Sequence, residues 1–290
     1  MNFIWYIAEQ NNRNHWGGTF VGFHQSEALK KSGHQVNLLD PASDFSYYVQ
    51  KMQPDWVYVP VEFTQYPCYQ NILHYKKIYK YGIVIGVGIF EKWAEKITGW
   101  DLLITQWYGK GVDNFPLQLH YVPHGFNPDL HFPTKQKILY NAVFIGRNQA
   151  RNRNPKKYIY KIKNVKYFGY GWPMDFEIAE MDKISQLYNQ AIVCPNFHGI
   201  NQKGDYCMLN ERTYQILACG GFQVCDYIPG MENYFEENTL LWEESTKEWE
   251  KKIKYYINHP MERQDYIQNG LKHVQKYSYH KIMNDFINLL

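Results

Sequence analysis

The sequence predicts an α/β protein of two domains, each built on a parallel sheet. Short apolar runs alternate with helical patterns along the whole chain, and this alternation is typical of βαβ units. Runs such as Ile83-Val84-Ile85 are apolar on both faces, as expected of strands inside a parallel sheet. With 290 residues, of which 45% are hydrophobic, the chain is long enough for two cores.

The first half contains a series of candidate strands with helical or loop-forming segments between them. The strands are expected at residues 3–8, 35–39, 55–59, 83–87, 101–105 and 119–122. The first helix should begin near Gly17 and Gly18 and end at Gly33, because glycine adopts the left-handed cap conformation at low cost.

A segment rich in helix and strand breakers then separates the two halves. It contains Pro123, Gly125, Pro128 and Pro133, which mark a linker. We therefore expect an N-terminal domain over 1–130 and a second domain over 131–276. In the second domain, strands are predicted at 141–145, 165–168, 191–194, 222–225 and 239–241, and helices at 154–163, 178–190 and 208–219. The end of the chain is helical, and residues 277–290 form a last helix that is expected to cross back to the first domain.

Composition excludes several classes of protein. The net charge is +3 with 20% charged residues, which is too balanced for a dedicated nucleic-acid binder. None of the five cysteines forms a pair with zinc-site spacing, and a scattered, odd set is typical of a reducing cytosol. No apolar stretch approaches the length of a membrane span. We expect a cytoplasmic protein without a metal site.

The loop after the first strand, residues 11–18 (NNRNHWGG), is the first candidate ligand site. Its glycines allow the backbone to approach a ligand, and the N-terminus of the following helix favours anions. The spacing lacks the full G-x-G-x-x-G pattern, so a plain βα turn explains it equally well.

A cationic segment follows the first strand of the second half. Gly146 and Arg147 close that strand, and Arg151, Arg153, Lys156 and Lys157 come soon after. Cations at the carboxyl end of a parallel strand lie where open α/β sheets bind ligands, and arginine binds a diphosphate through paired hydrogen bonds. A solvated helix start and a nucleic-acid patch are the alternatives.

Residues 195–229 (PNFHGINQKGDYCMLNERTYQILACGGFQVCDYIP) form the third candidate site. A polar loop containing glycine follows a strand there, and the next helix carries Asn210, Arg212 and Gln215. Such a loop and helix N-terminus are suited to cradle phosphates, and Gln215 is placed to bind a ribose hydroxyl.

This segment also carries a resemblance to a known family. LNERTYQILACGGFQVCDYIPGMENYF resembles the glycosyltransferase family related to the spore-maturation protein CgeB, with its Asn-x-Arg-x-aromatic, Ala-Cys-Gly-Gly and Asp-x-x-Pro-Gly patterns. YVPHGFNPDLHFP and NAVFIGR resemble the interdomain segment and the first donor-domain strand of GT-B glycosyltransferases. GGTFVGFHQSEALKKSGHQV resembles the first helix of their acceptor domain.

The resemblance implies a GT-B fold, in which two Rossmann-like domains face each other across a cleft. It implies transfer of a hexosyl or pentosyl group from a nucleoside diphosphate sugar, taken here to be of the UDP type, without a metal or other cofactor. The acceptor stays open between a glycan, a small molecule, a protein and modified DNA.

The resemblance also implies roles for individual residues. Arg212 and Arg147 would stabilise the leaving diphosphate. Further donor-binding candidates are Gly17, Gly18, Arg151, Lys156, Tyr170, Trp172, Asn210 and Gln215. Trp172 either stacks on the base or belongs to the core. On the acceptor side His15 and Trp16 would line the cleft, and Glu91 or His15 would serve as a general base if the reaction inverts.

One departure from the family pattern concerns an acidic pair. Many retaining GT-B enzymes carry two glutamates in an E-x7-E arrangement, whereas this chain has Cys207 and Gln215 at those positions. Glutamine still bonds a ribose hydroxyl, but both charges are lost. A protein that binds a nucleotide sugar without transferring it is therefore a second hypothesis, and an enzyme that glycosylates a hydroxylated DNA base is a third.

Overall fold

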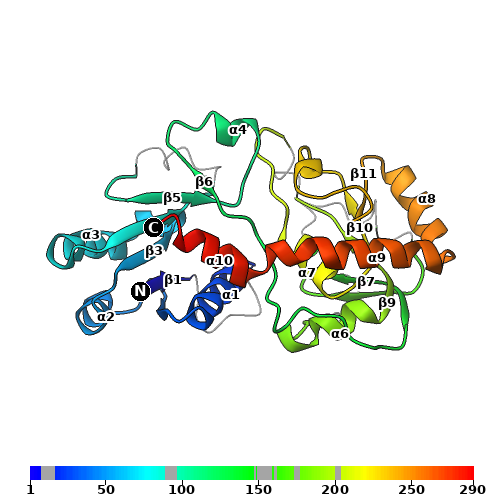
Figure 1. The fold of residues 1–290 in the computed structure, drawn as a ribbon, viewed down its shortest axis with the longest axis horizontal. Coiled ribbons are helices and arrows are strands. Elements are labelled where there is room, and N and C mark those ends of the chain that lie inside the picture. The colour runs from blue at the N-terminus through cyan, green and yellow to red at the C-terminus, as the bar shows by residue number, and fades with distance from the viewer. Residues whose placement is uncertain are drawn as a thin grey trace. The chain divides into compact units, whose positions relative to one another are not determined.

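The computed structural model describes residues 1–7, 17–88, 97–146, 148, 159, 162–172, 177–199 and 204–290, and of residues 17–20 the backbone only. The chain forms two compact units (Figure 1). Unit 1 comprises Met1–Pro123 and Tyr279–Leu290, and unit 2 comprises His124–Ser278. The chain therefore leaves unit 1 after Pro123 and returns to it at Tyr279.

Unit 1 is built on a parallel sheet that has six strands among the described residues. The strands are β1 (Asn2–Tyr6), β2 (Gln35–Leu39), β3 (Trp56–Pro60), β4 (Gly82–Gly86), β5 (Leu102–Thr105) and β6 (His120–Tyr121), in the order β2-β1-β3-β4-β5-β6. The helices are α1 (Gly17–Lys31), α2 (Phe45–Met52), α3 (Pro67–Tyr79), the short α4 (Lys110–Asp113) and α10 (Tyr279–Ile287), with a 3-10 turn at Val61–Gln65. The terminal helix α10 packs along α1, and its Asn284 accepts a hydrogen bond from Ser32.

Local sequence signals mark the ends of two helices of unit 1, α2 and α3. The alternation of apolar runs and helical patterns alone does not locate these helices. Asp44 caps α2 by accepting hydrogen bonds from the backbone of Ser46 at 3.0 Å and of Tyr47 at 3.4 Å, and α2 ends at Gln53 in the left-handed conformation. Pro67 occupies the first position of α3, where its missing N–H costs nothing. Both helices pack apolar side chains against a core that contains Ile4, Val57 and Ile83.

Unit 2 contains a second parallel sheet, with five strands among the described residues. They are β7 (Tyr140–Ile145), β8 (Val165–Phe168), β9 (Ala191–Asn196), β10 (Gln223–Asp226) and β11 (Leu241–Glu243), in the order β11-β10-β9-β7-β8. The helices are α6 (Ile184–Asn189), α7 (Glu211–Ala218), α8 (Thr246–Ile257) and α9 (Pro260–Val274), with 3-10 turns at Met181–Lys183, Met231–Asn233 and Gln275–Tyr277. Trp249 and Ile253 of α8 are buried against Val193 and Val224 of the sheet.

The strand orders of the two sheets place an equivalent topological switch point in each unit. In unit 1 the chain winds one way from β1 to β2 and the other way from β1 to β3, and in unit 2 the same reversal lies between β7 and β9. Open α/β sheets bind ligands at the carboxyl ends of the strands beside such a switch point. The fold thus directs attention to the ends of β1 and β3 and to those of β7 and β9.

The predicted fold class, α/β with two parallel sheets, is confirmed. Most predicted strands agree with the structure to within two residues, but the strand predicted at 191–194 continues through Pro195 to Asn196. The helix predicted at 178–190 begins only at Ile184. The helix predicted at 208–219 begins at Glu211 because Asn210 caps it. Most of the helix predicted at 154–163 lies outside the described residues.

Residues 124–130 lie at the start of unit 2. Phe126 donates its backbone N–H to the carbonyl of Tyr277 at 3.2 Å, so this segment is hydrogen-bonded to the end of unit 2. Over the residues that the structure covers, no helix is long and apolar enough to cross a membrane.

Candidate functional site

Arg212 lies at the switch point of unit 2. It is the second residue of α7, and its side chain reaches the carboxyl ends of two strands. Nη1 donates to the carbonyl of Ile145, the last residue of β7, at 3.0 Å. Nη2 donates to the carbonyl of Phe197, just after β9, at 3.0 Å. The guanidinium therefore bridges the two strands between which the chain reverses direction.

Gly146 allows the guanidinium to approach the end of β7. A Cβ at this position would lie 2.1 Å from Nη1 of Arg212, and the backbone φ of Gly146 is +155°. Both the space and the conformation disfavour any side chain. Gly146, which the sequence analysis noted together with Arg147, thus leaves the space that the side chain of Arg212 occupies.

The charge of Arg212 has no carboxylate partner among the described residues. Of the five N–H donors of a guanidinium, three are bonded, all to neutral oxygens: those of Ile145 and Phe197 and Oδ1 of Asn196 at 3.2 Å. No ion pair within the described part of the chain involves Arg212. Two N–H donors have no partner among the described residues, and an anion is the ligand that they favour.

Arg212 is half-buried and packs against an aromatic ring. Its Cζ lies 4.9 Å from the ring centroid of Phe144, a cation–π distance. Burial lowers the pKa of Arg212, and the nearby groups of Tyr188, Asp226 and Glu211 raise it in part. A bound anion would offset this desolvation, because attraction between charges is stronger where water is excluded.

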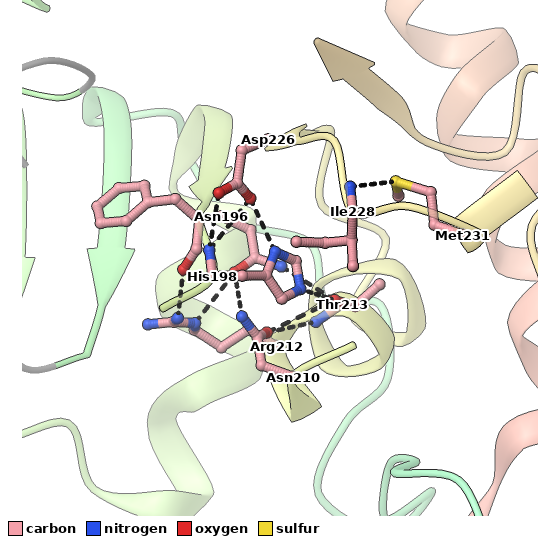
Figure 2. Close-up of polar contacts among 9 residues, drawn as sticks. Asn196, His198, Asn210, Arg212, Thr213, Asp226, Ile228 and Met231 are labelled. Atoms are coloured by element: carbon pink, nitrogen blue, oxygen red, sulfur yellow. Dashed lines mark hydrogen bonds and ion pairs between the residues drawn. The ribbon is translucent and has the colours of Figure 1, made fainter. Parts of the chain in front are cut away.

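A network of buried polar side chains supports this guanidinium (Figure 2). Asn196 accepts from Nε of Arg212 and from Nδ2 of Asn210, the latter at 3.1 Å. Asn210 also caps α7 by accepting from the backbone N–H of Thr213 at 3.3 Å. Each polar atom in a buried site needs such a partner, so the network holds Arg212 in one orientation.

His198 and Asp226 extend the network to the end of β10. The His198 Nδ1 and the Asp226 Oδ1 are 2.7 Å apart, with side chains that are 0% and 3% exposed. The backbone N–H of His198 is 3.1 Å from each carboxylate oxygen of Asp226. Strands β7, β9 and β10 are thereby joined at their carboxyl ends through side chains.

The remaining described candidates lie in different settings. Gly17 and Gly18 begin α1. Tyr170 is half-buried, and its carbonyl accepts from the backbone N–H of Asn148 at 2.9 Å. Trp172 is 5% exposed, stacks on Tyr167 with centroids 4.5 Å apart, and donates its indole N–H to the carbonyl of Gly146 at 2.9 Å. This packing favours the core alternative for Trp172.

Both positions of the missing acidic pair are buried. Gln215 is 5% exposed, and its side chain forms no hydrogen bond within the described part of the chain. Cys207 is 2% exposed, and its thiol donates to the carbonyl of Gly204 at 3.3 Å. Burial raises the pKa of the Cys207 thiol, as do the charges of Asp205 and Glu232, so this thiol does not replace a carboxylate.

Several predicted residues lie outside the described residues. They are His15, Trp16, Glu91, Arg147, Arg151 and Lys156. The segments on which they lie follow β1, β4 and β7 directly.

Sequence analysis did not identify Asn196, His198 or Asp226 as site residues. The strand predicted at 191–194 stops short of Asn196, which the sequence analysis places in a polar loop. The available signal was a polar residue at the carboxyl end of each successive strand. With respect to metals, no group of three or more His, Cys, Asp or Glu side chains suited to hold an ion occurs in the ranges that the structure covers.

Residues 149–288 match the family model described as "Glycosyl transferase-like". This match covers unit 2 from the segment after β7 and also α10 of unit 1. No curated protein is significantly similar to the chain in sequence.

The whole chain shares its fold with solved glycosyltransferase structures. Sucrose-phosphate synthase from Thermosynechococcus elongatus superposes with a TM-score of 0.70 at 13% identity, covering 99% of this chain and 98% of that one. HepE from Anabaena, in complex with UDP-glucose, gives 0.68 at 11% identity, with 100% of both chains covered. A DNA-modifying beta-glucosyltransferase, solved in the presence and absence of uridine diphosphoglucose, gives 0.68 at 12% identity, with 99% of both covered. The chain thus has a GT-B glycosyltransferase fold.

Proposed function

We propose that this protein is a glycosyltransferase that transfers a hexosyl or pentosyl group from a UDP-type nucleotide sugar, without requiring a metal. The observation that carries the proposal is Arg212, a partly buried cation at the switch point of unit 2 whose three hydrogen-bonded donors all reach neutral oxygens. The match of residues 149–288 to a glycosyltransferase-like family supports the same reading. UDP-glucose in the complex of HepE supports the choice of UDP.

In the proposed reaction, the bond between the anomeric carbon and the diphosphate oxygen breaks, and a bond from that carbon to an acceptor oxygen forms. The diphosphate leaves with the bonding electron pair, and the acceptor proton goes to a base. The main demand on the protein is to stabilise the negative charge that develops on the diphosphate. The two unbonded N–H groups of Arg212 are suited to that task.

The finer assignments rest on the sequence and are proposed on that basis. We propose membership of the CgeB-like family, a donor domain over 131–276, an acceptor-side domain over 1–130 and a cytoplasmic location. Arg147, Arg151 and Lys156 are proposed to assist Arg212 at the diphosphate. Asn210, Gln215 and Tyr170 are proposed donor-binding residues, with Gly17 and Gly18 at the first helix. His15 and Glu91 are proposed as acceptor-side bases.

The direct test is a panel of nucleoside diphosphates and their sugars, including UDP-glucose, measured by thermal shift and then by release of free sugar. We expect UDP and UDP-sugars to raise the unfolding temperature and at least one UDP-sugar to be hydrolysed slowly. Stabilisation with no turnover of any sugar would favour the non-catalytic alternative. The absence of stabilisation by every nucleotide would refute the donor site.

Modified DNA is a second candidate acceptor, because the fold is shared over 99% of both chains with a DNA-modifying beta-glucosyltransferase. Binding to duplex DNA containing hydroxymethylated bases, measured across a range of salt, tests it. Affinity that falls steeply with salt, together with transfer of labelled sugar to the duplex, would establish DNA as acceptor. Transfer to small glycosides but not to DNA would exclude it.

A further inference from the structure

One peptide group in unit 2 is held from both sides by charged side chains. The group joins Phe197 to His198, immediately after β9. Its carbonyl accepts from Nη2 of Arg212 at 3.0 Å, and its N–H points to the carboxylate of Asp226, 3.1 Å from each oxygen. The peptide dipole therefore lies between a cation and an anion, oriented favourably toward both.

A second connection between Asp226 and the same site passes through the ring of His198 (Figure 2). Nδ1 lies 2.7 Å from Asp226 Oδ1, and Nε2 lies 3.3 Å from Oγ1 of Thr213. Thr213 follows Arg212 on α7, and its hydroxyl also accepts from Nδ2 of Asn196 at 3.1 Å. Because Asn196 binds Nε of Arg212 through its oxygen, the contacts form a closed circuit around the base of the guanidinium.

Burial makes this circuit sensitive to the charge of Asp226. The side chains of His198 and Asp226 are 0% and 3% exposed, so water does not screen the carboxylate. In such surroundings a charge polarises the hydrogen bonds connected to it and strengthens them. Loss of the charge would weaken the hold of Asp226 on the peptide group, and with it the position of the carbonyl that orients Arg212.

We propose that Asp226 is a positioning residue for Arg212, acting through the Phe197–His198 peptide group and the ring of His198. The inference rests on the proposed function, because the ligand that Arg212 orients itself to meet is the diphosphate of the donor. Asp226 does not touch the donor in this proposal. It determines how well the two unbonded N–H groups of Arg212 discriminate a diphosphate from an uncharged nucleoside.

The experiment is a double-mutant cycle on Asp226→Asn and Arg212→Lys, with the affinities of UDP and uridine measured by titration calorimetry. The quantity of interest is the ratio of the two affinities, because a general loss of folded protein lowers both equally. We expect Asp226→Asn alone to lower the ratio about tenfold, within the range for charge-assisted hydrogen bonds. In the Arg212→Lys background we expect the same change to have almost no further effect, since interacting residues are not additive.

Two further variants complete the test. Asp101→Asn is the matched control, because the carboxylate of Asp101 also accepts a backbone N–H, from Ile83 at 2.7 Å, and pairs with a cation, Lys76, but does so in unit 1. It should leave the ratio unchanged. Thr213→Val removes the hydroxyl that joins the ring of His198 to Asn196 and should lower the ratio about threefold; this variant tests the proposal even if Asp226→Asn does not fold.

The outcomes distinguish a failure of the proposed function from a failure of the positioning role of Asp226. If wild-type protein binds UDP no better than uridine, the proposed function fails and this inference falls with it. If wild type prefers UDP but the effects of Asp226→Asn and Arg212→Lys are additive, or Thr213→Val leaves the ratio unchanged, the function stands and the positioning role of Asp226 is overturned. A non-additive cycle with an unchanged Asp101→Asn control supports it.

Discussion

The two switch points of the molecule have the same topology, but the described residues that lie at them differ in chemistry. In unit 1, β1 ends at Tyr6, which is 0% exposed and packs against Phe45 and Phe63. In unit 2, β9 and β10 end at Asn196 and Asp226, which belong to the polar network around Arg212. The same βαβ winding therefore supports an aromatic cluster at one switch point and a cationic site at the other.

The two switch points also differ in the hydrogen bonding of their buried polar groups. The hydroxyl of Tyr6 has no hydrogen-bond partner among the described residues, although the ring that carries it is buried and packed. In the network of unit 2, Arg212, Asn196 and Asp226 each form two or more hydrogen bonds. An unpaired buried polar group lowers stability, whereas a fully bonded network orients its members. Substitutions should therefore be costly in unit 2 and nearly neutral at the matching position of unit 1.

The largest expected effect is that of Arg212→Lys. Lysine keeps the charge but loses the planar fork that binds two strand ends and an anion together, so we expect kcat/KM for the donor to fall at least about 100-fold, as for loss of a transition-state donor. Steady-state kinetics at saturating acceptor, with circular dichroism to confirm folding, measure this.

The matched control is Arg263→Lys. Arg263 also donates from its guanidinium to two backbone carbonyls, those of Tyr256 and Ile257, but it does so between α8 and α9. Its replacement should lower stability without lowering kcat/KM. Equal losses of activity in both variants would show that Arg212 has a structural role only.

Gly146→Ala should have the next largest effect. Its methyl group would lie 2.1 Å from Nη1 of Arg212, at a φ of +155°, so the guanidinium has to move. We expect a loss of about 1 to 3 kcal/mol in the free energy of unfolding from backbone strain and a drop in donor affinity of about tenfold. Chemical denaturation and calorimetry measure the two quantities.

Gly204→Ala separates the effect of backbone strain from the effect of displacing the Arg212 guanidinium. Gly204 has a comparable φ of +150°, but no atom of the described residues lies within 4 Å of its Cβ position. This variant should lose stability while retaining more donor affinity than Gly146→Ala. If both variants lose affinity to the same extent, displacement of Arg212 is not the cause.

The predictable and unpredictable parts of this molecule follow from the range of the interactions. Strands such as 35–39 and 165–168 were located to the residue because an apolar run bounded by breakers is a local signal. Tyrosines and lysines obscure the helical spacing of the apolar residues in α3. The proline at its start is therefore its one clear local signal. Arg212 was identified because it belongs to a recognisable sequence pattern.

The residues that support Arg212 could be identified only from the tertiary structure. Asn196, His198 and Asp226 come from two strands separated by a helix and a loop, and no spacing in the sequence indicates that they meet. Arg212 lies 66 positions after Gly146 in the sequence. The close approach of its side chain to Gly146 likewise depends on the register of β7 and β9. Polar strand ends in a predicted parallel sheet are the one signal that would have placed these residues together.

A smaller effect is expected from acid. Burial lowers the pKa of His131 to about 4, and Nδ1 accepts a hydrogen bond from the backbone N–H of Asn127 at 3.1 Å. An unfolded histidine has a pKa near 6.5, so below that pH the unfolded state binds the proton more readily than the folded state. Stability from this group is complete above pH 6.5 and is lost as pH falls toward 4, by about 1 kcal/mol at pH 5.5.

Urea denaturation of wild type and His131→Asn at pH 7.5 and 5.5 measures that loss. The asparagine oxygen retains an acceptor for Asn127 but does not titrate. The variant should therefore lose less stability than wild type between the two pH values. The same loss in both proteins would assign the acid sensitivity to other groups of unit 2.

The smallest effect is expected at the switch point of unit 1, with Tyr6→Phe. The change removes a buried hydroxyl that has no hydrogen-bond partner in the part of the chain that the structure describes and keeps the ring between Phe45 and Phe63. The free energy of unfolding should stay the same or rise by less than about 1 kcal/mol, because no hydrogen bond is lost and a desolvation cost is relieved. Denaturation and donor kinetics, run beside Arg212→Lys, check both quantities. A large loss of activity in Tyr6→Phe with stability intact would mean that the hydroxyl meets a ligand at the end of β1, and that the two switch points are alike in function after all.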